Sequence, residues 1–85
     1  MTEYLDHNKK KIRKGFYKRH YFGFDQIYYF NGNYNKKGNP LVEKDSENKI
    51  RFCCLEFASD LIRLSKKDLE ERIFRGKWIE EKLKE

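Results

Sequence analysis

The chain has 85 residues and a net charge of +6, and aromatic residues make up 16% of it. A chain this short buries only about 60–65% of the surface that its unfolded form exposes, so we expect one domain whose small core is filled largely by rings. No stretch reaches the roughly 20 apolar residues that cross a bilayer, which predicts a cytoplasmic protein without membrane contact.

The net positive charge of the chain comes from its first half. Residues 1–42 carry nine Lys or Arg and three acidic residues, whereas residues 43–85 carry eleven of each. Seven of the nine cations lie within eleven residues, at Lys9, Lys10, Lys11, Arg13, Lys14, Lys18 and Arg19. Clustered charge produces a local field that a dispersed surplus would not, so this cluster is the first candidate for a binding surface.

The N-terminal part of the chain divides into a loose segment and the start of a sheet. Residues 1–11 show no hydrophobic period, and we expect a flexible basic segment there. From residue 12 the composition favours strands, because nine of the nineteen residues from Phe16 to Tyr34 are Phe or Tyr. Gly15, Gly23 and Gly32 interrupt this stretch, as bulges and sharp bends do.

Two polar turns divide the middle of the chain into further strands. The first turn spans residues 35–40 and contains Gly38 and Pro40, and the second spans residues 45–48. Between them residues 41–44 predict a short strand, and residues 49–55 predict another from their alternating polarity. Residues 56–60 are typical of a single helical turn, and residues 61–64 complete a set of five strands.

The C-terminal residues 65–85 predict an amphipathic helix. Ser65 followed by Asp68 has the form of a capping box, and apolar residues then recur close to the helical period. Gly76 interrupts this pattern and costs about 1 kcal/mol relative to alanine. Either a break in the helix or a close contact is expected at that position.

The predicted fold class is therefore α+β. Residues 12–64 form a small five-stranded, strongly bent antiparallel sheet or an SH3-like barrel, and the C-terminal α-helix closes it. The order of five short strands, with a helical turn between the fourth and the fifth, resembles that of SH3-like barrels.

The basic segment interleaves its cations with aromatic rings. Nucleic acid requires both, because cations neutralise phosphates and flat side chains stack on unpaired bases. Alternate side chains of a strand point to opposite faces, so we expect one set of rings, headed by Phe16 or by Tyr17, to be buried and the other exposed. The sequence favours a module for RNA or single-stranded DNA with contacts from Lys9, Lys10, Lys11, Arg13, Lys14, Tyr17, Lys18, Arg19 and Tyr21.

Two other roles remain open for the same segment. It can dock on an acidic protein, as a small inhibitor or adaptor does, or it can be a solvated face with no dedicated role. A second aromatic cluster, Tyr28, Tyr29 and Tyr34, is either core or a platform for a peptide, a methylated lysine or a base.

The apolar face of the C-terminal helix also has two interpretations. In the first it covers the sheet and completes the core. In the second it presents Trp78, Ile79 and Leu83 to a partner, which includes a second copy of the chain in a homodimer. An uncovered Trp would favour association.

Catalytic chemistry has little support in the sequence. His20 lies among cations, as the general base of a metal-independent ribonuclease-like toxin would, but Asp25 or Glu56 can assist it only through the fold. Cys53 and Cys54 are adjacent, so on a strand they point to opposite faces and a bond between them is strained. With two histidines and no Cys-x-x-Cys pair, we expect a non-enzymatic protein without metal or cofactor.

Overall fold

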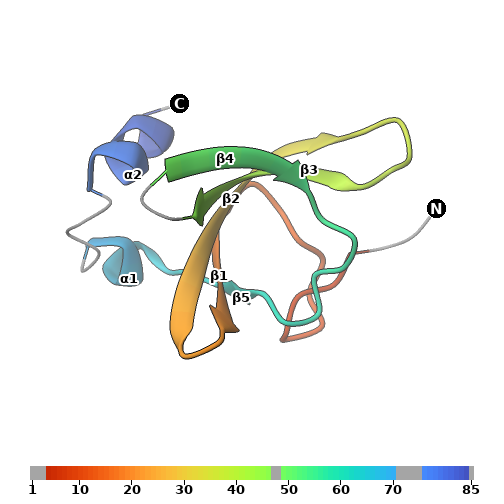
Figure 1. Cartoon of the computed structure of the whole chain (residues 1–85), viewed down its shortest axis with the longest axis horizontal. Helices are drawn as coiled ribbons and strands as arrows, with labels where there is room; N and C mark the ends of the chain where they lie inside the picture. Colours follow the sequence, from red (N-terminus) through yellow and green to blue (C-terminus); the bar gives the residue numbers. More distant parts are fainter. Residues whose placement is uncertain (1–3, 47–48, 71–75, 85) are drawn as a thin grey trace.

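The computed structural model describes residues 4–46, 49–70 and 76–84, which form one sheet and two short helices (Figure 1). The elements are β1 Gly15–Tyr21, β2 Phe24–Tyr34, β3 Pro40–Ser46, β4 Lys49–Cys54, β5 Ile62–Arg63, α1 Lys66–Glu70 and α2 Gly76–Leu83. The strands follow the order β4-β3-β2-β1-β5, and each neighbouring pair is antiparallel. The predicted α+β class with a five-stranded antiparallel sheet is confirmed, but the sheet is open and not closed into a barrel, because β4 and β5 form its two edges.

The register of β1 on β2 places large rings on both faces of the sheet. Phe16 lies opposite Tyr29, and the adjacent pair, Tyr17 and Tyr28, faces the other way. Between 1% and 4% of each of these four side chains is exposed. The expectation that one of the two sets of rings is exposed is wrong for Phe16 and Tyr17, because both faces are covered here.

The face that carries Tyr17 and Tyr28 is covered by two irregular segments, residues 4–12 and residues 55–61. These segments lie side by side on one side of the sheet (Figure 1), and the backbone N–H of His7 donates to the carbonyl of Leu61 at 2.8 Å. Together with the strands they bury one cluster, made of Tyr4, Ile12, Tyr17, Tyr28, Phe30, Val42, Leu55, Ala58 and Leu61.

Asp6 holds the N-terminal segment in a tight loop. Its carboxylate accepts the backbone N–H groups of Asn8 at 2.8 Å and Lys10 at 3.1 Å, and its own N–H donates to the Lys10 carbonyl at 2.8 Å. Both Asp6 and Tyr4 are buried. Residues 4–11, predicted to be loose, therefore fold back against the sheet, while residues 1–3 of that segment lie outside the described part of the chain.

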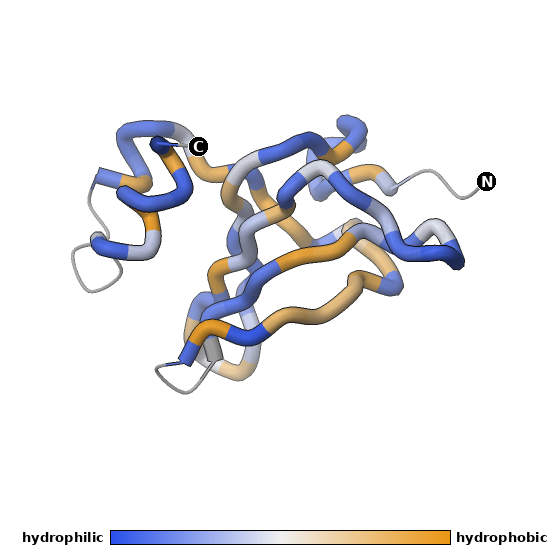
Figure 2. The backbone as a smooth tube through the Cα atoms, turned by 90° about the horizontal axis from the view of Figure 1, so that it is seen from above, coloured by the Kyte–Doolittle hydropathy of each residue, from blue (hydrophilic) through white to orange (hydrophobic). Residues whose placement is uncertain are grey.

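The opposite face of the sheet is covered by α1 and α2. Trp78 packs edge-on against Phe16, with ring centroids 5.1 Å apart, and Phe16 in turn lies 4.8 Å from Tyr29. This second cluster comprises Phe16, Ile27, Tyr29, Leu64, Leu69, Trp78 and Ile79. Figure 2 shows hydrophobic positions along the central strands and hydrophilic positions at the turns.

Two of the three helix residues predicted as a partner interface are thus core residues. Trp78 is 8% exposed and Ile79 is 3% exposed, because both pack on the sheet. Leu83 alone of the three is exposed, at 57%. The interpretation in which the C-terminal helix covers the sheet is the one that the structure supports.

The start of the C-terminal helical region has the predicted capping box. The hydroxyl of Ser65 accepts the N–H of Asp68 at 3.2 Å, and the Asp68 carboxylate accepts the N–H of Ser65 at 2.9 Å. The structure describes two helices in the range predicted as one, and α2 begins at Gly76; residues 71–75 between them lie outside the described residues. Neither described helix is long and apolar enough to cross a membrane.

The turn between β1 and β2 consists of Phe22 and Gly23. Both have a positive φ, +46° and +84°, as a type I′ hairpin turn requires. This conformation suits Gly23 but costs a bulky L-residue about 1–2 kcal/mol. Phe22 is 84% exposed, so little packing offsets that cost.

We predict that Ile79→Ala lowers the free energy of unfolding by about 2–5 kcal/mol, because it opens a cavity in the second cluster. Leu83→Ala, on the same helix but exposed, should change it by less than about 0.5 kcal/mol. Urea unfolding followed by circular dichroism measures both. Equal effects of the two substitutions would contradict the packing of α2 described above.

We predict that Phe22→Asn stabilises the protein by about 1 kcal/mol, because Asn adopts positive φ more readily and Asn-Gly is the preferred type I′ pair. Phe24→Asn is the matched control, since it removes an exposed ring from the same hairpin at an ordinary strand position. Thermal unfolding of the three proteins decides the matter: a lower midpoint for Phe22→Asn would mean that the ring itself holds the hairpin together.

Candidate functional site

Tyr17, predicted to stack on a nucleic-acid base, is 1% exposed. Its hydroxyl accepts the backbone N–H of Arg13 at 3.0 Å and a guanidinium N–H of Arg63 at 3.1 Å. The ring lies in the first cluster, under the N-terminal segment. The prediction of Tyr17 as a stacking residue is therefore wrong, because its face of the sheet is covered.

The hairpin end of β1 carries balanced charge. Arg19 lies 2.9 Å from a carboxylate oxygen of Asp60, and His20 Nδ1 lies 3.1 Å from one of Asp25. The sequence indicated that Asp25 could reach His20 only through the fold. The register of the hairpin places the two residues opposite each other. Lys18, in register with Ile27 of β2, is on the face opposite to Arg19.

Four exposed rings gather around this end of the hairpin, and we name them the aromatic tip: Tyr21, Phe22, Phe24 and Phe57. The guanidinium of Arg19 lies over two of them, 5.0 Å from the centroid of Tyr21 and 5.7 Å from that of Phe57. Tyr21 contacts Phe22 and Phe24, with centroids 4.4 Å and 6.2 Å apart. The predicted residue Tyr21 is thus exposed, but within an apolar patch and not a basic one.

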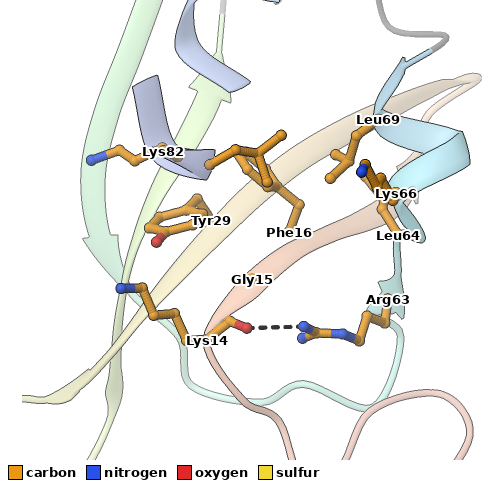
Figure 3. A pocket seen from close by; sticks show the side chains of 10 residues that line it. Lys14, Gly15, Phe16, Tyr29, Arg63, Leu64, Lys66, Leu69 and Lys82 are labelled. Atoms are coloured by element: carbon orange, nitrogen blue, oxygen red, sulfur yellow. Dashed lines mark hydrogen bonds between the residues drawn. The ribbon is translucent and has the colours of Figure 1, made fainter. Parts of the chain in front are cut away.

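A pocket of about 530 Å³ lies on the other face of the sheet, under α1 and α2, and we call it the cationic pocket. Its described lining residues are Lys14, Gly15, Phe16, Tyr29, Arg63, Leu64, Lys66, Leu69, Lys82 and Leu83. Four of them are cations and none is acidic. Figure 3 shows two cations on each side of the pocket with the rings between them: Lys14 and Lys82 on one side, Arg63 and Lys66 on the other.

Arg63 is held in place by neutral acceptors. Its guanidinium donates to the backbone carbonyls of Arg13 at 3.2 Å and Lys14 at 2.9 Å (Figure 3), and to the Tyr17 hydroxyl at 3.1 Å. It also lies over the Tyr17 ring, 5.3 Å from the centroid. Among the described residues no carboxylate pairs with it, so its positive charge is positioned without being neutralised.

Gly15 makes room for this guanidinium. A Cβ on Gly15 would lie 2.5 Å from Nη2 of Arg63, closer than a real Cβ approaches any atom. The φ of Gly15, +145°, is also one that other residues rarely adopt. The glycine expected to mark a bulge or bend therefore leaves room for the Arg63 guanidinium beside the start of β1.

The other three cations of the pocket differ in their surroundings. Lys82 forms an ion pair with the buried Glu43 and lies 5.2 Å from the centroid of the Tyr29 ring, so its charge is largely neutralised. Lys14 and Lys66 are exposed and form no ion pair with any described residue. The pocket thus has three cations without acidic partners in the described part of the chain.

Lys14 also connects the pocket to the basic segment. The side chains of Lys9, Lys10, Lys11, Arg13 and Lys14 are all exposed, as predicted. We call these five exposed cations the basic path. The path ends at the pocket, because the carbonyls of Arg13 and Lys14 bind Arg63, which lines the pocket. Lys18 and Arg19, predicted to act with the path, lie beyond the buried Phe16 and Tyr17 along β1.

Sequence reasoning missed Arg63, Lys66 and Lys82 as site residues. All three belong to the half of the chain in which eleven cations balance eleven acids. A balanced count conceals where the charges lie, and here Glu80 and Glu81 are exposed while Lys82 lines the pocket. No local motif marks these cations, because β5 and α2 reach the pocket only through the fold.

The second aromatic cluster does not form a cage for a ligand. Tyr28 and Tyr29 are buried on opposite faces of β2, and Tyr34 packs on Phe30 with centroids 5.5 Å apart. Three rings cannot face one point in this arrangement. Core packing, the first of the two interpretations, is correct for Tyr28 and Tyr29.

The cysteines form no disulfide and, together with the histidines, no metal-binding group among the described residues. Cys53 and Cys54 are both free, and no three His, Cys, Asp or Glu side chains among the described residues are placed to hold a metal. Cys53 packs against the first cluster, and this burial raises the pKa of its thiol. Cys54 is exposed on the other face of β4.

We predict that Cys54 reacts with a thiol reagent at pH 8 well before Cys53, which is less accessible and, with a raised pKa, has less thiolate. Cys54→Ser should remove the fast phase of the reaction and Cys53→Ser should keep it. The release of the reagent's chromophore measures both phases. Equal rates for the two single variants would contradict the burial of Cys53.

The chain matches no protein-family model, no curated protein and no solved structure. What the site can do therefore follows from its own residues. The described lining of the cationic pocket offers four cations and an apolar wall, a combination that suits it to hold an anion.

Proposed function

We propose that this protein is a non-enzymatic module that binds single-stranded nucleic acid, either RNA or DNA. The strand follows the basic path from Lys9 to Lys14 and reaches the cationic pocket. The observation that carries this proposal is a pocket with three unneutralised cations, in continuity with five exposed cations of the N-terminal segment, Lys14 being common to both.

The electrostatic basis is the release of counterions. Each phosphate that a Lys or Arg neutralises frees a condensed cation, which favours binding at low salt. A cation already paired with a carboxylate contributes less, because the pair has to be broken. Arg63, Lys14 and Lys66 have no such partner among the described residues, whereas Arg19 has Asp60.

The pocket also offers apolar surface to the sugar and the base. Leu83 is exposed at its rim, and the edges of Phe16 and Tyr29 form its floor. These rings are buried against the sheet, so they provide contact and not the open stacking platform predicted for Tyr17 and Tyr21. The proposal therefore keeps Lys9, Lys10, Lys11, Arg13 and Lys14 from the predicted contacts and adds Arg63 and Lys66.

A second candidate function is protein interaction, and the aromatic tip favours it. Its exposed rings surround a neutralised Arg19, which suits an apolar protein surface better than a phosphate backbone. The acidic partner predicted from the basic segment would instead dock on the basic path.

The proposal also includes an SH3-like relation and a cytoplasmic location. Neither of the two candidate functions depends on them. The ribonuclease alternative gains a carboxylate partner for His20, namely Asp25.

We predict that a fluorescent single-stranded oligonucleotide binds at about 50 mM salt, with an affinity that falls by a log–log slope of about −0.7 for each phosphate contact. Lys10→Gln with Arg13→Gln removes two cations of the basic path. This double variant should bind about tenfold more weakly and reduce the magnitude of the slope by about 1.4. Fluorescence anisotropy at several salt concentrations measures affinity and slope together.

Lys36→Gln with Lys37→Gln is the matched control. It removes the same charge from the β2–β3 turn, where both side chains are exposed, and should leave affinity nearly unchanged. Equal weakening by both double variants would show that only net charge matters. No binding at 50 mM salt would refute the proposal and leave the protein-interaction function as the leading candidate.

A further inference from the structure

We infer that the cationic pocket is a site for a phosphate monoester, the doubly charged group at the end of a nucleic-acid strand or on a free mononucleotide. For the strand this rests on the proposed function, which concerns binding along the basic path. The pocket itself is a separate claim, because a free mononucleotide can occupy it whether or not a strand binds.

The first support is the number of hydrogen-bond donors that Arg63 has left unused. A guanidinium has five N–H donors, and three of them are used, on the Arg13 and Lys14 carbonyls and the Tyr17 hydroxyl. Two donors remain unused by these hydrogen bonds, and Arg63 is one of the residues that line the pocket. A positioned guanidinium with donors left over is suited to bind a phosphate oxygen, because little side-chain entropy remains to be lost.

The second support is the number of cations around one pocket. Lys14 precedes β1 and Lys66 belongs to α1, so they reach the pocket from opposite sides of its apolar floor (Figure 3). A phosphate within a strand carries a single charge, whereas a phosphate monoester carries about −1.5 to −2 near pH 7. Coulomb energy scales with the product of the charges, so three cations favour the monoester over an internal phosphate.

The third support is the shape of the pocket. It is walled by β1 and β5 on the sheet side and by α1 and α2 on the other, and its volume of about 530 Å³ lies within the range of small-ligand sites. The basic path leads away from the pocket at Lys14, and this is the direction that the rest of a strand takes.

The test compares three decathymidine oligonucleotides of identical sequence that carry a 5′-phosphate, a 3′-phosphate or only hydroxyl ends. Each carries an internal fluorophore, and binding is measured by anisotropy at fixed salt. We expect one phosphorylated oligonucleotide to bind at least about tenfold more tightly than the hydroxyl-ended one, the effect of one added charge-assisted hydrogen bond. Equal affinities of all three would overturn the inference while leaving the proposed function intact.

Two variants connect this preference to the pocket. Arg63→Gln should abolish the preference for the phosphorylated end, whereas Arg13→Gln, on the basic path, should weaken all three oligonucleotides alike. Lys66→Gln changes an exposed side chain of α1 and should reduce the preference without affecting the fold, so the test does not depend on Arg63→Gln being folded. A preference unchanged in folded Arg63→Gln or in Lys66→Gln would also overturn the inference.

A mononucleotide distinguishes this inference from the proposed function. Isothermal titration of the intact protein with adenosine 5′-monophosphate and with adenosine shows whether the pocket recognises the phosphate directly. Binding of the monophosphate alone, with no oligonucleotide binding, would support the pocket and refute the strand-binding function. If neither the monophosphate nor any phosphorylated oligonucleotide binds, the inference is wrong.

Discussion

The structure depends on the burial of two adjacent residues of β1, Phe16 and Tyr17, on opposite faces of one sheet. Their cross-strand partners, Tyr29 and Tyr28, are buried with them, so β1 and β2 lie between two clusters. A small domain rarely has enough chain to cover both faces of a sheet. This one uses residues 4–12 and 55–61 on one face and two short helices on the other, and large rings fill both clusters.

Covering both faces determines what remains for binding. The middle of β1 is lost to the core, so the basic aromatic segment is split into two ends with different properties. At the hairpin end, Arg19 and His20 meet carboxylates, and exposed rings dominate. At the other end, Lys14 meets Arg63 and Lys66 around a pocket whose described lining has no acid. The two surfaces therefore differ in chemistry: one is apolar with paired charges, and the other is cationic with an apolar wall.

Arg63 connects the core to this second surface. It belongs to the two-residue edge strand β5, and it satisfies the carbonyls of Arg13 and Lys14 where the chain enters β1. Arg63 also lines the pocket, and Gly15 leaves space for its guanidinium. One side chain thus stabilises the start of the sheet and places a positive charge that no carboxylate among the described residues neutralises.

The sequence by itself determined the elements with strong local signals: five strands, the turn at residues 35–39, and the Ser65–Asp68 cap. These depend on backbone conformations and periods that neighbouring residues specify. It also identified the exposed cations from Lys9 to Lys14. Only the tertiary structure decided that Tyr17 and Trp78 are core, that Asp60 neutralises Arg19, and that Arg63 and Lys66 join Lys14. The physical reason is that burial and charge neutralisation depend on segments far apart in sequence, such as those of Phe16 and Trp78, which no local pattern encodes.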